Sequence, residues 1–172
     1  MKKIVLTGYM GSGKTTLAPL LAQAAGLPYL DLDKVIEQNE GMSVPEIFQS
    51  KGEVYFRKSE HSTLKNILRG PEGFVLATGG GTPCYAGNHE LLKADDIVSV
   101  YLKTSVGELH RRLQGGGMES RPLLAALNEE EQQEYIAKHL FDRSYYYLQA
   151  KHIIQTDGKT TEKLVNEIMS LF

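Results

Sequence analysis

One stretch constrains the fold of this chain more than any other. Residues 8–15 have the sequence Gly-Tyr-Met-Gly-Ser-Gly-Lys-Thr, fit the pattern G-x-x-x-x-G-K-[ST] and follow the apolar run Ile4-Val5-Leu6 directly. Glycines let backbone N–H groups fold around phosphates where a Cβ would clash. The pattern predicts a strand, a phosphate-binding loop and a helix whose positive N-terminal end attracts phosphate. The alternative is a glycine-rich turn that binds nothing.

Within the loop, residue type predicts each task. Lys14 should reach the β- and γ-phosphates of a nucleotide, and the Thr15 hydroxyl should bind Mg²⁺. The residues expected around the ATP phosphates are Gly11, Ser12, Gly13, Lys14, Thr15 and Thr16.

Composition narrows the class of protein. The chain has 172 residues, 41% hydrophobic and 23% charged, which suits one domain over residues 1–172 with one core. The formal net charge of −2 argues against partners such as nucleic acid or anionic membrane. One cysteine, Cys84, allows no internal disulfide and no thiolate metal site. No apolar run approaches the ~18 residues of a membrane span, so we expect a cytoplasmic protein, and from its size a monomer.

Apolar runs alternate with helical patterns along the chain. The expected strands are residues 3–7, 29–33, 73–78, 97–102 and 152–155. Strands that alternate with helices predict an α/β fold with a five-stranded parallel sheet, whose ligands lie at the carboxyl ends of the strands. The phosphate-binding loop, the pair Asp31 and Asp33, and the glycines 79–81 each follow a strand, so they should meet at one edge.

Further expectations concern local structure. Alternation in the second strand places Asp31 and Asp33 side by side, although Asp33 is also a candidate helix N-cap before Lys34. Helical pieces should be interrupted at Gly41 and Gly52. Three helix starts are expected from their capping residues: Ser43 with Glu46, Asn88, and Ser105 with Glu108.

Several charged and aromatic residues are candidates for contacts with other groups. Arg57 and Glu60 stand three apart on a helix and can pair. Arg121 lies in a glycine-rich segment with the composition of a mobile loop, from which an arginine can close over phosphates. The tyrosines 145–147 are expected in the core rather than on bases, and the histidines show no ligand spacing.

Taken together, these stretches resemble the shikimate kinase family, within the nucleoside-monophosphate-kinase-like group of phosphate-loop folds. The resemblance runs nearly end to end. It rests on residues 8–15, Asp31-Leu32-Asp33, Phe56-Arg57 with Glu60, Gly79-Gly80-Gly81, Arg121-Pro122-Leu123-Leu124, and Arg143 followed closely by tyrosine. It implies the P-loop NTP hydrolase fold as a three-layer sandwich, with a substrate-binding helical insert near 34–60 and a lid near 113–125.

The resemblance also implies an activity: transfer of the γ-phosphoryl group of ATP to the 3-hydroxyl of shikimate, on the route to chorismate and the aromatic amino acids. Asp33 would orient or deprotonate that hydroxyl. Asp31 would help to position Mg²⁺ through water, beside Thr15. Lys14 and Arg121 would offset charge on the transferring phosphoryl group.

The same resemblance assigns the substrate and base contacts. Arg57 and Arg143 would clamp the substrate carboxylate, since guanidinium groups give directional, charge-assisted contacts. Gly79, Gly80 and Gly81 would complete the substrate pocket. Arg112 would lie near adenine, opposite the turn at Asp157.

Two observations limit the resemblance. The chain has Thr82-Pro83-Cys84 where the family commonly has an apolar residue shortly after the three glycines, and the segment 115–120 is slightly long. The alternatives are a gluconate kinase or nucleoside-monophosphate kinase of the same fold, a nucleotide-dependent switch and an inactive relative. Against a switch, the third strand ends in Thr78-Gly79 without an aspartate.

Overall fold

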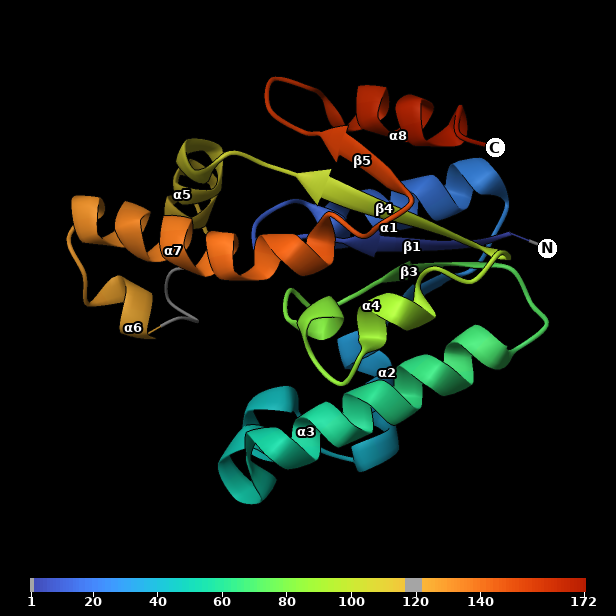
Figure 1. Cartoon of the computed structure of the whole chain (residues 1–172), viewed down its shortest axis with the longest axis horizontal. Coiled ribbons are helices and arrows are strands. Elements are labelled where there is room, and N and C mark those ends of the chain that lie inside the picture. The colour runs from blue at the N-terminus through green and yellow to red at the C-terminus, as the bar shows by residue number, and fades with distance from the viewer. Residues whose placement is uncertain (1, 117–121) are drawn as a thin grey trace.

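The structure is a computed structural model that describes residues 2–116 and 122–172. Its centre is a five-stranded sheet of order β2-β3-β1-β4-β5 in which all neighbouring strands are parallel (Figure 1). The strands are β1 (Lys3–Thr7), β2 (Tyr29–Asp31), β3 (Phe74–Ala77), β4 (Ile97–Lys103) and β5 (His152–Gln155). The predicted α/β class and parallel sheet are confirmed, and each of the five predicted strands is present, although the second is shorter than predicted.

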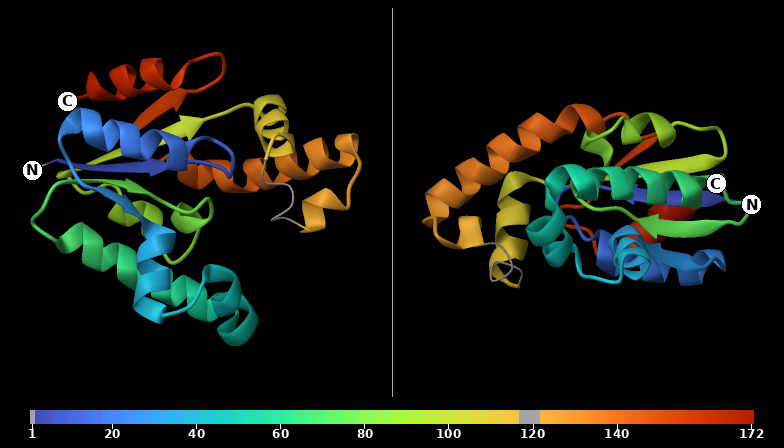
Figure 2. Two further views of the ribbon diagram at one scale, coloured as in Figure 1. Left: turned by 180° about the vertical axis from the view of Figure 1, so that it is seen from behind. Right: turned by 90° about the horizontal axis from the view of Figure 1, so that it is seen from below.

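Helices cover both faces of this sheet (Figure 2). They are α1 (Lys14–Ala25), α2 (Leu32–Glu40), α3 (Val44–Arg69), α4 (Asn88–Leu91), α5 (Val106–Gln114), α6 (Pro122–Ala125), α7 (Glu129–Tyr147) and α8 (Thr161–Met169), with a 3-10 turn η1 (Thr82–Cys84). No helix of the described chain is long and apolar enough to cross a membrane.

Alternate residues of β1 face the two helical layers. Ile4 and Leu6 pack in a core cluster with Leu17 of α1 and Ile168 of α8. Val5 packs in a second cluster formed largely with residues of α2 and α3. Side chains of a strand point alternately to the two faces of its sheet, so a run that is apolar throughout is buried on both sides.

A third cluster joins the loop after β1 to α5 and α7. Tyr9 of the loop, Leu109 of α5 and Tyr147 of α7 are buried together. The Tyr147 ring stacks on Tyr101 of β4 with 5.0 Å between centroids. The expected core packing is therefore right for Tyr147, whereas Tyr145 is 66% exposed.

The predicted second strand is wrong at its end. β2 stops at Asp31, which is the N-cap of α2 and accepts a hydrogen bond from the Lys34 N–H through Oδ1 at 3.2 Å. Asp33 lies in the first helical turn and is not the N-cap. A carboxylate at position 31 can satisfy a free N–H of the helix start, which favours a helix over two more residues of an edge strand.

The expected caps have mixed outcomes. Ser43 and Glu46 form the predicted capping box of α3. The cap expected at Asn88 is wrong: Gly87 is the N-cap, and the buried Asn88 amide donates to the Thr82 carbonyl at 2.8 Å. Ser105 caps α5 as predicted, but Glu108 does not return to the Ser105 N–H. A carboxylate oxygen of Asp157 accepts from that N–H instead, at 3.0 Å.

Both predicted interruptions of the helical segment are confirmed. Gly41 ends α2 in the left-handed conformation, with φ 67°. Gly52 has φ 85° and ψ 170° inside α3, which divides this helix into two parts. The second part carries Phe56, Arg57 and Glu60, so the kink at Gly52 sets the direction of the segment that holds them.

Candidate active site

A cleft of about 640 Å³ lies at the carboxyl edge of the sheet. Its lining includes residues 10–15 of the predicted nucleotide loop together with residues from the segments that follow the other strands. The predicted site residues found there are Gly11, Ser12, Gly13, Lys14, Thr15, Thr16, Asp33, Gly79, Gly80 and Arg112. Five other predicted site residues of the described chain lie outside this lining: Asp31, Arg57, Gly81, Arg143 and Asp157.

The loop after β1 encloses the Lys14 side chain. Gly13 is the N-cap of α1 in the left-handed region, with φ 100°, a conformation that a side chain disfavours. The Lys14 ammonium donates to the carbonyls of Gly8 at 2.6 Å and Tyr9 at 3.1 Å. Its positive charge is therefore held inside the loop, at the start of a helix.

Asp33 has an unusual protonation equilibrium. Its pKa is raised from 3.8 to about 6 by burial and by the nearby carboxylates of Asp31, Glu60 and Glu37, while Lys14 acts in the opposite direction. Burial and like charge both disfavour the ionised form. Asp33 is therefore a carboxyl that titrates close to neutral pH, as a general base should.

Glycine at positions 79–81 after β3 is explained by other residues lying close to the backbone. Unusual backbone angles are not the reason, because none of the three has positive φ. A Cβ on each glycine would meet a different site residue. A Cβ on Gly80 would lie 3.3 Å from Arg143 Nη1, and one on Gly81 would lie 2.8 Å from Arg57 Nη2. A Cβ on Gly79 would lie 3.1 Å from Thr82 Oγ1 and 3.4 Å from Asp33 Oδ1. The backbone of this segment thus lies against Asp33 and both arginines.

Arg57 is held on several sides. Its Nη1 donates to Glu60 Oε1 at 2.9 Å, and Glu60 is 1% exposed. The other Glu60 oxygen accepts from the Thr82 hydroxyl at 2.8 Å. The guanidinium also lies over the Tyr85 ring, 3.9 Å from its centroid. Arg57 and Tyr85 line a second cleft of about 540 Å³.

The sequence alone did not indicate the contacts that Thr82 and Tyr85 make in this site. Thr82 belongs to the segment that departs from the family pattern, and that departure was the one signal in the sequence. That departure did not indicate what Thr82 does. The contacts of Thr82 with Glu60 and of Tyr85 with Arg57 join α3 to a turn more than 20 residues away in the sequence.

Arg143 reaches the glycine segment from α7. It hydrogen-bonds to Tyr147, whose hydroxyl donates to the Gly80 carbonyl at 2.6 Å. Burial is the largest cause of a raised pKa at Tyr147, so its hydroxyl stays protonated and remains a donor. Tyr147 thereby links the Arg143 side chain to the Gly80 backbone, a role that the expectation of core packing did not include.

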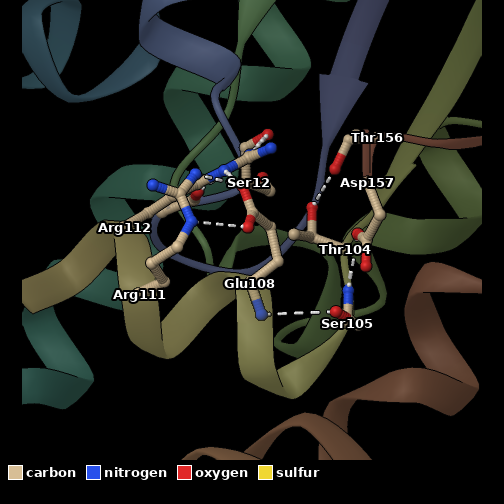
Figure 3. Close-up of polar contacts among 9 residues, drawn as sticks. Ser12, Thr104, Ser105, Glu108, Arg111, Arg112, Thr156 and Asp157 are labelled. Atoms are coloured by element: carbon tan, nitrogen blue, oxygen red, sulfur yellow. Dashed lines mark hydrogen bonds and ion pairs between the residues drawn. The ribbon is translucent and has the colours of Figure 1, made fainter. Parts of the chain in front are cut away.

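A polar network joins α5 to the phosphate-binding loop (Figure 3). Arg112 Nη1 donates to the carbonyls of Gly11 at 3.3 Å and Ser12 at 3.2 Å, and its Nε donates to Glu108 at 2.7 Å. Asp157, predicted near adenine, accepts from the Ser105 N–H and does not line the cleft. Arg121 lies outside the described residues, so its predicted place in a lid stays a prediction.

Comparison with known proteins agrees with this geometry. The family model described as shikimate kinase matches residues 10–172. A shikimate kinase of Flavobacterium johnsoniae is 50% identical over 171 residues, which cover 99% of each protein. The crystal structure of a shikimate kinase from Bacteroides thetaiotaomicron has a TM-score of 0.88 at 33% identity, covering 99% of this chain and 97% of that one.

A second solved structure was determined with a bound substrate. It is the shikimate kinase from Acinetobacter baumannii in complex with shikimate, with a TM-score of 0.84 at 35% identity over 99% of this chain and 92% of that one. Agreement in family model, in sequence over nearly the whole length and in fold shows that this chain belongs to the shikimate kinase family and is a phosphotransferase.

Proposed function

We propose that this enzyme transfers the γ-phosphoryl group of ATP to the 3-hydroxyl of shikimate, giving shikimate 3-phosphate and ADP in the synthesis of aromatic amino acids. The observation that carries the proposal is one cleft in which Lys14 of the phosphate-binding loop and Asp33 lie with Gly79 and Gly80. A phosphate-binding group and a carboxyl that titrates near pH 6 suit phosphoryl transfer to an alcohol.

Asp33 is the base in this proposal. In its ionised form it accepts a hydrogen bond from the attacking hydroxyl and takes the proton as the oxygen bonds to the γ-phosphorus, while the bond from that phosphorus to the bridging oxygen breaks and ADP leaves. Its own burial and the carboxylates around it raise its proton affinity, which favours that transfer. Lys14 offsets negative charge on the phosphoryl group during the same step.

The two arginines select the acceptor. Arg57 and Arg143 lie against successive residues of the glycine segment, at Gly81 and Gly80. Two guanidinium groups that approach from different helices, α3 and α7, suit a carboxylate held between them. Gluconate also has a carboxylate, so the discrimination between acceptors depends on the spacing between this clamp and Asp33.

The site has features that fit Mg²⁺. The pKa of Asp33 is raised by its burial and by Asp31, Glu60 and Glu37, with Lys14 opposing, so several carboxylates lie near Asp33, and a divalent cation would offset their charge. Thr15 lines the cleft and Asp31 is the carboxylate nearest in sequence to Asp33. When bound, Mg²⁺ supplies positive charge to the phosphate oxygens of ATP.

The small number of candidate protein ligands also suits magnesium. The described residues contain no group of three or more histidines, cysteines, aspartates or glutamates arranged to hold a metal. Mg²⁺ keeps several waters and commonly uses one or two protein oxygens plus substrate phosphates. We therefore assign Thr15 as a direct ligand and Asp31 as a partner through water.

Release of ADP in a coupled assay tests the proposed function. Shikimate, gluconate and nucleoside monophosphates are offered separately, each with ATP and with or without Mg²⁺. We expect turnover that requires both shikimate and Mg²⁺. Turnover with gluconate or a nucleoside monophosphate, and none with shikimate, would assign the acceptor site to one of the alternative kinases.

Two further expectations concern the location of the enzyme and its oligomeric state. A supply of ATP is required, which is a reason to expect the enzyme in the cytoplasm. From its size we expect a monomer, and sedimentation of the purified chain near 19.1 kDa would agree with that expectation.

A further inference from the structure

Glu108 has no role in the proposed reaction, yet its carboxylate lines the nucleotide cleft. An unpaired carboxylate in a cleft for ATP would repel the phosphates. Glu108 is paired with two arginines of its own helix: Oε1 accepts from Arg112 Nε at 2.7 Å, and both of its oxygens accept from Arg111, at 2.7 and 2.8 Å. These contacts lower the Glu108 pKa to about 2, so the carboxylate is ionised throughout the working range.

The two arginines are in different environments. The Arg111 side chain is 71% exposed, and an exposed pair three residues apart on a helix contributes little. The Arg112 side chain is 25% exposed and continues from Glu108 to the carbonyls of Gly11 and Ser12 (Figure 3). The pair formed by Glu108 and Arg112 therefore connects α5 to the loop that surrounds the phosphates.

The hydrogen bonds from Arg112 to the Gly11 and Ser12 carbonyls also orient the N–H groups of the same two peptides. In a trans peptide the carbonyl and the N–H that follows it point in opposite directions. A guanidinium bonded to the Gly11 and Ser12 carbonyls therefore directs the N–H groups of Ser12 and Gly13 away from itself. The Ser12 N–H is used within the loop, by the Tyr9 carbonyl at 3.1 Å. The Gly13 N–H remains for a phosphate.

The start of α5 is fixed as well, so Glu108 projects from a rigid support. The Ser105 hydroxyl accepts from the Glu108 N–H at 3.3 Å, and the Ser105 N–H donates to Asp157 at 3.0 Å. Beside them the buried hydroxyls of Thr104 and Thr156 are 2.7 Å apart. Because Asp157 takes the place of glutamate at the Ser105 N–H, the Glu108 carboxylate is free to pair with Arg112.

We propose that Glu108 is a positioning residue for nucleotide binding, which holds the Arg112 guanidinium against the phosphate-binding loop and so fixes the Ser12–Gly13 peptide. This inference rests on the proposed use of ATP. It differs from an ordinary helix ion pair, which would affect stability slightly and leave nucleotide binding unchanged.

A double-mutant cycle tests the inference, with Glu108→Gln, Arg112→Ala and the double variant. Glu108→Gln keeps the size of the side chain and removes its charge. We expect it to raise the KM for ATP about tenfold, as the loss of a charge-assisted hydrogen bond does, with kcat and the KM for shikimate within about twofold. In the Arg112→Ala background Glu108→Gln should not raise the KM for ATP further, because Glu108 acts through the Arg112 guanidinium and that group is absent.

Glu90→Gln is the matched control. Glu90 also pairs with a cation three residues later on its helix, Lys93 at 2.7 Å, but it is not part of the cleft lining. This variant should leave both KM values unchanged. A KM for ATP that stays within about twofold in Glu108→Gln, or a tenfold rise that persists without Arg112, would overturn the inference.

Titration with ADP separates this inference from the proposed function. If the wild-type enzyme shows no turnover with shikimate, the proposed reaction fails, while calorimetry with ADP and Mg²⁺ still reports nucleotide binding. We expect Glu108→Gln to weaken ADP about tenfold in that experiment as well, and equal ADP affinity in wild type and variant would exclude the positioning role.

Discussion

Gly81 and Arg57 are so close that a Cβ on Gly81 would lie 2.8 Å from Nη2 of Arg57 and 3.0 Å from Nη1. The guanidinium cannot simply turn aside, because Glu60 holds its Nη1 at 2.9 Å and Tyr85 covers its face at 3.9 Å. The position of the arginine therefore depends on the absence of a side chain at residue 81. Gly81 itself has an ordinary backbone conformation, with φ −86°.

Gly81→Ala should displace Arg57 from the acceptor carboxylate. The loss of charge-assisted hydrogen bonds predicts a rise of about tenfold or more in the KM for shikimate, with the KM for ATP little changed. Steady-state kinetics with each substrate varied in turn measures both. Gly107→Ala is the control, because nothing lies within 4 Å of a Cβ there. Equal KM values for shikimate in Gly81→Ala and wild type would exclude the steric argument.

Tyr85 should matter through its ring and not through its hydroxyl. An arginine over an aromatic face is stabilised by ~0.5–2 kcal/mol, so Tyr85→Leu should raise the KM for shikimate about two- to thirtyfold. Tyr85→Phe keeps the ring and should behave as wild type. Tyr55→Leu is the matched control, since the Tyr55 ring pairs with Lys51 at 4.4 Å on the exposed part of α3. Equal losses in the Leu and Phe variants at residue 85 would contradict a role for the ring.

The sequence predicted the parts of this site that depend on local patterns. The strand, loop and helix around residues 8–15, the alternation of strands and helices along the chain, and the pairing of Arg57 with Glu60 follow from spacing within a few residues. The structure confirms these three features. Contacts between segments distant in the chain were not predictable in the same way. Tyr85 meets Arg57, and Asp157 meets Ser105, only because the sheet brings those segments together.

The error at Asp33 has a similar cause. Alternation over residues 29–33 indicated a strand, and the pattern of side chains alone could not show that Asp31 would cap a helix. The pairing of Glu108 was also ambiguous in sequence, since a glutamate three residues after Ser105 suits a capping box. In the structure Glu108 pairs with Arg112 instead, because Asp157 from another segment accepts the hydrogen bond of the Ser105 N–H.

The rate should depend on pH through Asp33. Its pKa is raised to about 6, and only the ionised form can accept the proton of the hydroxyl, so kcat/KM for shikimate should fall about tenfold per pH unit below pH ~6 and level off above it. A profile measured from about pH 5 to 8 should therefore show one ionisation near 6. A flat profile over this range would mean that Asp33 orients the hydroxyl without taking its proton.

Asp33 should also lower the stability of the enzyme at neutral pH. The folded protein binds the Asp33 proton more tightly than the unfolded chain, since the pKa rises from 3.8 to about 6 on folding. Stability from this group is therefore present below pH ~4 and is lost as pH rises to ~6. Asp33→Asn should increase the free energy of unfolding by about 1–3 kcal/mol at pH ~7 while abolishing turnover. Urea unfolding measures the gain, which should vanish near pH 3; an equal gain at both pH values would show that the Asp33 charge is not its cause.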